Sequence, residues 1–203
     1  GPLAWSHDNT RGGIWDMNGN IWEWQGGIRL VWGELQILEN NNAADPANSQ
    51  ASSSANWKAI KASDGTLVEP ECSPSDSAAK LTGDTVKLDY VKDAWVWTTT
   101  VTSSLNESRG CQFGNVACAD EISASVKVLL SSLALLPDEG STVTDYEGDY
   151  IWWNNCTSER SVFRGANWSS GALAGVFSLN GSVARTASSL GLGFRSVYIP
   201  ESE

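Results

Sequence analysis

Side chains that could perform catalysis are scarce in this chain of 203 residues. It contains one histidine, His7, and four cysteines. A Ser-His-Asp triad would have to use His7, which lies in a polar, glycine-rich segment, and no G-x-S-x-G sequence supplies a nucleophile. A metal site with three histidine ligands is excluded by counting, and no G-x-G-x-x-G or P-loop sequence is present. These residue types therefore predict no catalytic centre of the familiar kinds.

The four cysteines are Cys72, Cys111, Cys118 and Cys156. An even number permits disulfides in a secreted protein. The spacing between Cys111 and Cys118 is too long for the paired-cysteine clip of a zinc site. We expect buried or half-buried thiols, with a Cys111–Cys118 bridge as the alternative.

The densest acidic cluster is Asp145, Glu147 and Asp149, followed by Asn154 and Asn155. Oxygen ligands on a loop are what calcium prefers. Short patterns of this kind more often form a solvated acidic loop than a metal site. We therefore predict no cofactor, and calcium held by Asp145, Glu147 and Asp149 is the alternative.

Residues 164–195 mix two kinds of side chain. Glycines, aromatics and apolar residues, among them Trp168, Val176 and Phe194, are of the type that a tight core needs. The others are small and chemically mixed, and Leu173 and Leu190 stand where turn chemistry favours Ser, Asn or Asp. This pattern indicates a scaffold that carries an interchangeable set of exposed side chains. The predicted ligand-binding positions are Asn167, Ser169, Ser170, Leu173, Ser182, Val183, Ala187, Ser189, Leu190 and Gly191.

Three stretches of the chain resemble a known family. Arg164-Gly165-x-x-Trp168 with Gly193-Phe194-Arg195, and the upstream run 16–24, resemble the two signatures of the formylglycine-generating-enzyme type of C-type lectin fold. The middle, residues 174–177 and their spacing to Gly193, is similar to the variable proteins of diversity-generating retroelements. The resemblance implies an α+β C-type lectin fold with short antiparallel strands, few helices and long loops, and a variable region over about 164–195.

In that family an error-prone reverse transcriptase rewrites template adenines, so that one scaffold comes to display many side-chain sets. The resemblance implies a receptor-recognition domain on a virion tail tip or a bacterial cell surface, with a protein or glycan of a bacterial surface as ligand. Because the predicted positions are mostly small, we expect no strong single hot spot. Affinity would come from shape, from flanking aromatics such as Trp152 and Trp153, or from multivalent display.

Two alternatives to receptor recognition are an oxidase and a carbohydrate-binding module. A metal-dependent oxidase of the formylglycine-generating type needs cysteines near the Gly-Phe-Arg end, but the last cysteine here, Cys156, precedes Arg164. A fixed calcium-dependent carbohydrate-binding module would use the acidic cluster, but the lectin Glu-Pro-Asn triplet is absent. We therefore expect a binding protein rather than an enzyme.

The composition bounds the domain organisation and the partners. A hydrophobic content of 41% with 11 Trp and 19 Gly predicts one loop-rich domain over 1–203. A net charge of -11 disfavours nucleic acid and anionic membranes, and no apolar run is long enough for membrane insertion. Residues 1–3 resemble the remnant of a cleaved expression tag, so we expect the natural protein to extend further upstream.

The elements that would position these residues follow from periodicity. Apolar residues at helical spacing predict a helix over 120–136, with Asp120 as N-cap and Pro137 ending it. Alternation predicts a strand over 21–24, with Trp22 and Trp24 on one face. A hairpin is predicted over 28–38, strands over 87–91 and 95–101, and loops over 39–56, 63–86 and 103–119.

Overall fold

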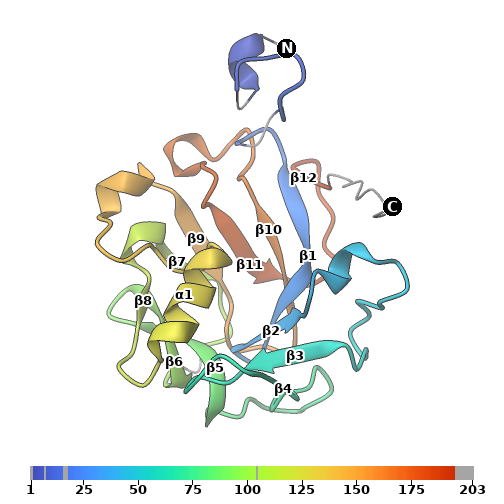
Figure 1. The fold of residues 1–203 in the computed structure, drawn as a ribbon, viewed down its shortest axis with the longest axis vertical. Helices are drawn as coiled ribbons and strands as arrows, with labels where there is room; N and C mark the ends of the chain where they lie inside the picture. The colour runs from blue at the N-terminus through green and yellow to red at the C-terminus, as the bar shows by residue number, and fades with distance from the viewer. Residues whose placement is uncertain (1, 7, 16–17, 104, 195–203) are drawn as a thin grey trace.

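Strands predominate over helices in this α+β fold (Figure 1). The computed structural model describes residues 2–6, 8–15, 18–103 and 105–194. Within these ranges the one α-helix is α1 (Ala124–Ser132). His7, Asp16 and Arg195, which were considered above, lie outside the described residues.

One curled, mixed sheet joins the strands in the order β7-β9-β11-β10-β1-β2-β5-β6-β8, with β12 beside β1, and with β3 beside β2 and β4. The strands are β1 (Trp22–Val31), β2 (Glu34–Leu38), β3 (Trp57–Ile60), β4 (Leu67–Val68), β5 (Thr82–Val91), β6 (Ala94–Thr100), β7 (Arg109–Gln112), β8 (Ala117–Cys118), β9 (Tyr150–Trp153), β10 (Arg160–Arg164), β11 (Leu179–Val183) and β12 (Leu192–Gly193). The 3-10 turns are η1 (Leu3–Trp5), η2 (Asn42–Ala44), η3 (Phe113–Asn115), η4 (Val143–Tyr146) and η5 (Gly171–Leu173).

Strand direction departs from the prediction of short antiparallel strands. The pairs β9/β11, β1/β12 and β6/β8 are parallel, and β1 and β5 each run for ten residues. Alternation of side chains is the same in both directions, so the sequence pattern does not encode which partner a strand will find. The long connections between these strands are what allow the parallel pairings.

The predicted hairpin over 28–38 is confirmed. β1 and β2 pair antiparallel from Ile28↔Ile37 to Val31↔Glu34. The turn residues Trp32 and Gly33 both have positive φ, at 49° and 85°. A two-residue turn of this shape matches the twist of the flanking strands.

The predicted helix is shorter than its apolar stripe. The Ser123 hydroxyl, rather than Asp120, caps it by accepting a hydrogen bond from Val126 N at 3.4 Å. The helix ends at Ser132, and Ala134, with φ of 50°, interrupts the helical backbone before the chain reaches Pro137. The stripe itself packs on the main core, where Val126 and Leu130 are fully buried. No helix of the described ranges is long and apolar enough to cross a membrane.

The predicted loops hold more sheet than expected. Residues 103–119 contain β7 and β8, and the segment 57–60 becomes β3. These strands have two to four residues and pair with distant partners, β7 with β9 and β8 with β6. Their pairing comes from tertiary neighbours, because segments this short carry no usable periodicity.

Candidate binding face

A row of side chains crosses four strands on the outer face of the sheet. Trp152 of β9 pairs with Asn180 of β11, Asn180 with Phe163 of β10, and Phe163 with Trp24 of β1. Register partners point to the same side of a sheet, so these four side chains share one face. Their sequence neighbours Ile151, Val162 and Leu179 point the other way and are buried in the main core.

Edge-on ring contacts make this row continuous. Trp22, two residues before Trp24, packs against Trp152 at 5.8 Å and against Phe163 at 5.2 Å between ring centroids. Trp24 meets Phe163 at 5.1 Å. Such edge-to-face pairs stabilise the packing beyond the apolar area that they bury. The prediction that Trp22 and Trp24 share a face is confirmed, and together with Phe163 they form a rigid aromatic floor.

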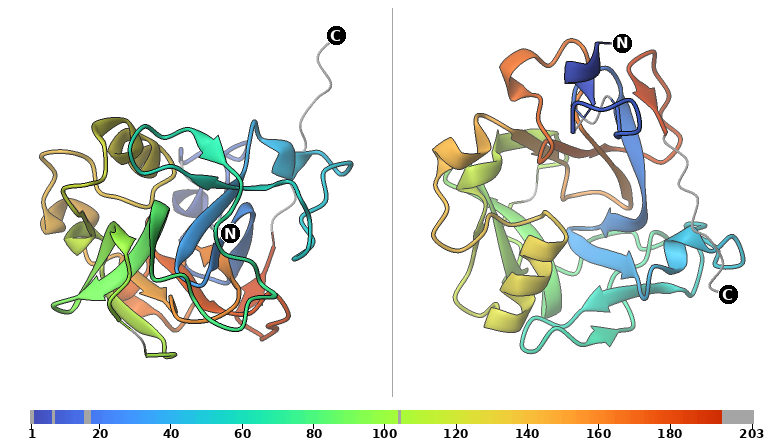
Figure 2. Two further views of the ribbon diagram at one scale, coloured as in Figure 1. Left: turned by 90° about the horizontal axis from the view of Figure 1, so that it is seen from below. Right: turned by 45° about the horizontal axis from the view of Figure 1, so that its top comes forward.

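The stretches that carry the family resemblance meet beside this floor. Gly19 N donates to Gly165 O at 2.7 Å, and Trp168 N donates to Asn20 O at 3.0 Å. Glu23 pairs with Arg164 on one side and with Gly193 on the other. Segments far apart in the sequence thus lie together at one end of the molecule, as the two further views show (Figure 2).

A shallow hollow opens at one end of this floor, against Trp22 and Trp152, with a volume of about 340 Å³. We call it the Trp22–Trp152 hollow. Of the ten predicted ligand-binding positions, four lie in its lining. The residues that line it are Trp22, Trp152, Asn167, Ser169, Ser170, Leu173 and Asn180.

Two asparagines shape the lining. The Asn167 carbonyl oxygen accepts from Ser169 N at 3.2 Å and from the Ser170 hydroxyl at 3.0 Å, which holds the turn that precedes η5. The Asn180 carbonyl oxygen accepts from Ser182 N at 2.9 Å and from the Ser182 hydroxyl at 2.7 Å. Within the described residues, neither amide nitrogen has a recorded partner. The hollow therefore offers amide N–H donors beside exposed hydroxyls on an aromatic base.

The remaining predicted positions are exposed, half-buried or, for Gly191 alone, buried. Ser189 and Leu190 are exposed on the loop after β11, and Leu190 is 99% exposed. Ser182, Val183 and Ala187 are half-buried, and Val183 packs against the aromatic floor.

Gly191 was predicted to contact ligand, but it is buried. Its carbonyl accepts from Trp22 N at 2.8 Å, and a Cβ there would lie 2.6 Å from the Asn167 amide nitrogen. Gly191 is a structural glycine.

The aromatic predictions need two corrections. Trp153 is 1% exposed and belongs to the main core, because on β9 it points opposite to Trp152. Trp168, Val176 and Phe194 were predicted as core, but they are 75%, 51% and 77% exposed. Trp168 stands between Asn167 and Ser169, in the same small polar surroundings that marked Leu173. That signal was present in the sequence and was missed, so the predicted positions leave out an exposed aromatic that stands among them.

The acidic cluster serves the backbone around it. Asp145 closes a capping box with Thr142, whose hydrogen bonds lower the pKa of the carboxyl. Asp149 is buried and accepts from Phe177 N at 2.8 Å. Burial raises the pKa of Asp149, although the Phe177 N–H partly opposes this. Glu147 ends the 3-10 turn with a left-handed backbone. Across the described ranges, no three His, Cys, Asp or Glu side chains come together as a metal site requires.

No cysteine of the described residues lines the Trp22–Trp152 hollow. Cys111 faces the main core, and Cys111 and Cys118 are not joined to each other. Burial raises the pKa of both thiols, that of Cys118 to about 11. Thiols in such surroundings stay protonated and poorly nucleophilic at neutral pH.

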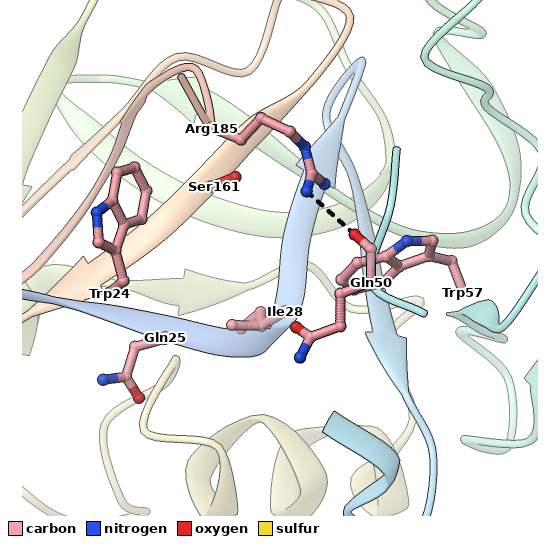
Figure 3. A pocket seen from close by; sticks show the side chains of 7 residues that line it. All are labelled: Trp24, Gln25, Ile28, Gln50, Trp57, Ser161 and Arg185. Carbon is pink, nitrogen blue, oxygen red and sulfur yellow. Dashed lines mark hydrogen bonds between the residues drawn. The ribbon is translucent and has the colours of Figure 1, made fainter. Parts of the chain in front are cut away.

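A second hollow lies at the Trp24 end of the row, with a volume of about 240 Å³ (Figure 3). We call it the Arg185 hollow. The figure shows Trp24 on one side, Arg185 and Gln50 on the other, and Ile28 beneath. Arg185 donates to both carboxylate oxygens of Glu159, at 2.6 and 2.7 Å. Sequence reasoning missed this hollow, because its walls come from β1, β3, β10 and two separate loops.

A scan against protein-family models finds no matching family, and a search of curated proteins finds no match.

Proposed function

We propose that this chain is a ligand-recognition domain and that the Trp22–Trp152 hollow is its principal contact site. The observation that carries the proposal is that four of the predicted positions line one hollow together with the packed rings of Trp22 and Trp152. Mobile contacts cost binding free energy when they become ordered, whereas a floor held by ring packing and a backbone ladder is already organised. Exposed Trp168, on the turn between Asn167 and Ser169, adds contact area of the kind that dominates interfaces.

We further propose that the scaffold is a C-type lectin fold of the kind used by retroelement-diversified variable proteins. The meeting of the 18–24 and 164–193 segments supports this, because both signature stretches then serve one site. On this proposal the domain is displayed on a virion tail tip or a bacterial surface and binds a protein or glycan there. Display in several copies would raise the avidity of a shallow site.

A combined substitution tests the contact site. Ser169, Ser170, Leu173, Ser189 and Leu190 would be replaced together by a second set of small polar and apolar residues. Thr is used at position 170, because the Ser170 hydroxyl holds the turn before η5. We expect the unfolding temperature to change by less than about 10 °C, because surface changes away from caps and buried groups cost about 0.5 kcal/mol or less each. Binding to a panel of immobilised bacterial surface extracts should change partner or disappear.

Unfolding of this variant would place the five residues in the structural core and would overturn the proposal. The retroelement origin has a separate test in DNA. A near-copy of the 164–195 coding region that differs at adenines should lie beside the gene, with a reverse transcriptase. Its absence would remove the diversification proposal and leave the binding proposal standing.

A further inference from the structure

The Arg185 hollow is lined by an arginine in a protein with a net charge of -11. Its carboxylate partner, Glu159, is shared with a second arginine, since Arg29 donates to it at 2.7 Å and Arg185 binds both of its oxygens. Arg29 is buried under the Trp57 ring, whereas the Arg185 side chain is 34% exposed and lines the hollow.

The position of Arg185 is set by the strand beneath it. β1 bulges between Gln25 and Arg29, where its register with β10 shifts. Gly27 has φ of 74° in this bulge, and its N–H donates to the Gln50 side chain at 2.8 Å. The Gln50 backbone carbonyl in turn accepts from Arg185 Nη1 at 3.0 Å (Figure 3). Arg185 is therefore held by Glu159 and Gln50 before any ligand arrives, which lowers the entropic cost of binding.

The guanidinium retains unused donors. It carries five N–H bonds. Three are engaged, by the two Glu159 oxygens and by Gln50 O. Five minus three leaves two, one on each terminal nitrogen, which can be donated to oxygens of an anionic ligand.

We propose that the Arg185 hollow binds the carboxylate of an acidic sugar residue. Arg185 supplies the two remaining N–H donors, and Trp24 supplies an aromatic wall against which the apolar face of a pyranose ring can pack. The Ser161 hydroxyl lies between them (Figure 3), and no partner for it is recorded in the described part of the chain. A hydroxyl and an indole suit a polyhydroxylated ring better than a flexible acidic side chain, which would leave both without a use. This site lies outside the Trp22–Trp152 hollow and does not depend on the function proposed for it.

A pair of sugars that differ only at the carboxylate tests the proposal. The full chain, with ¹⁵N-labelled tryptophan, would be titrated with D-glucuronate and with D-glucose while the Trp24 indole signal is followed by NMR. We expect a saturable shift with glucuronate, and at least about tenfold weaker binding of glucose because the charge-assisted hydrogen bonds are lost. Equal binding of the two sugars, or no shift of Trp24 with either, would overturn the proposal.

Three variants separate recognition from general charge effects. Arg185→Gln should weaken glucuronate binding roughly tenfold, and Ser161→Ala severalfold while leaving Arg185 and its partners in place. Arg11→Gln, which removes an exposed charge elsewhere, should leave it unchanged. An equal loss in Arg11→Gln would reduce the effect to the net charge and contradict the proposal. Should Arg185→Gln unfold, Ser161→Ala decides the outcome.

A further titration tests whether the hollow prefers the carboxylate of a peptide to that of a sugar. A short blocked peptide with one glutamate would be titrated in the same way. Tighter binding of this peptide than of glucuronate at the Trp24 signal would overturn the acidic sugar in favour of an acidic peptide. Success or failure at this hollow leaves the surface-extract result for the Trp22–Trp152 hollow unaffected, so the two proposals are judged separately.

Discussion

Trp168 is the side chain from which most of the binding energy should come. It is 75% exposed, between two residues that line the Trp22–Trp152 hollow, and its backbone N–H is already held by Asn20 O. Burying an indole in an interface is among the largest single contributions to affinity. We expect Trp168→Ala to weaken binding by about tenfold or more, measured on the bacterial surface extract that the unaltered protein binds.

The same substitution should leave stability almost unchanged, within about 0.5 kcal/mol in a urea titration. Val128→Ala on α1 is the matched control, because Val128 is also exposed but lies away from the hollow. Equal loss of binding in both variants would show that Trp168 has no special part in recognition.

Lys87, in contrast to Trp168, is a buried charged side chain that we expect to affect stability rather than binding. It is fully buried and donates to Glu71 at 2.7 Å and to the Thr85 hydroxyl at 2.8 Å. Glu34, also fully buried, accepts from the same Thr85 hydroxyl at 2.6 Å. Removing Lys87 leaves buried Glu34 and half-buried Glu71 without their counter-charge.

We therefore expect Lys87→Met to lower the free energy of unfolding by about 3–5 kcal/mol. Lys58→Met, which breaks the exposed Lys58–Glu69 pair, should cost less than about 1 kcal/mol. Urea denaturation of both variants measures the difference. A loss for Lys87→Met no larger than that for Lys58→Met would mean that the network relaxes around the missing charge.

At the scale of elements, the bulge in β1 connects the sheet to the Arg185 hollow. Gly27 has positive φ, and a Cβ there would lie 2.7 Å from the Ala43 Cβ of η2. A side chain would therefore strain the backbone and push the η2 loop outward, carrying Gln50 with it. Bulges of this kind re-aim neighbouring side chains, and here the chain of contacts ends at Arg185.

We expect Gly27→Ala to destabilise the protein by about 1–3 kcal/mol and to weaken glucuronate binding at the Trp24 signal. Gly12→Ala is the control, because its Cβ would meet nothing within 4 Å and its φ is not positive. Thermal unfolding and the NMR titration would be measured on both. Normal glucuronate binding by Gly27→Ala would separate the bulge from the position of Arg185.

At the scale of the whole molecule, several carboxylates make the fold sensitive to acid. Burial acts to raise the pKa of Glu159, but hydrogen bonds from Arg185 and Arg29 outweigh it and hold the pKa below its usual 4.5. The pKa of Glu71 is lowered in the same way by Lys87. A pKa that is lower in the folded state adds stability above the unfolded value, and this stability is lost as the pH falls through the folded pKa.

Urea midpoints should therefore hold steady from about pH 7 to about pH 5 and fall below about pH 4.5. Asp149, whose pKa is raised, acts in the opposite sense but is a single group. Glu159→Gln should make the acid loss shallower, because one of the shifted carboxylates is gone. An unchanged midpoint down to about pH 3 would mean that these pairs contribute nothing to folding.

The local features of this protein could be predicted from its amino-acid sequence. The apolar stripe of α1, the hairpin at Trp32–Gly33 and the shared face of Trp22 and Trp24 all follow from periodicity and turn chemistry, which depend on neighbours along the chain. The small polar surroundings of Leu173 and Leu190 likewise marked two exposed side chains correctly.

Which of these features come together depends on tertiary contacts that the sequence pattern does not encode. The tertiary structure placed Trp152 in a hollow and Trp153 in the core, exposed Trp168, and buried Gly191 beside Asn167. It also joined Arg185 to Glu159 and Gln50, which come from three separate segments. The physical reason is that alternation tells which residues share a face, whereas the partner strands and loops, joined through long connections, decide what covers that face.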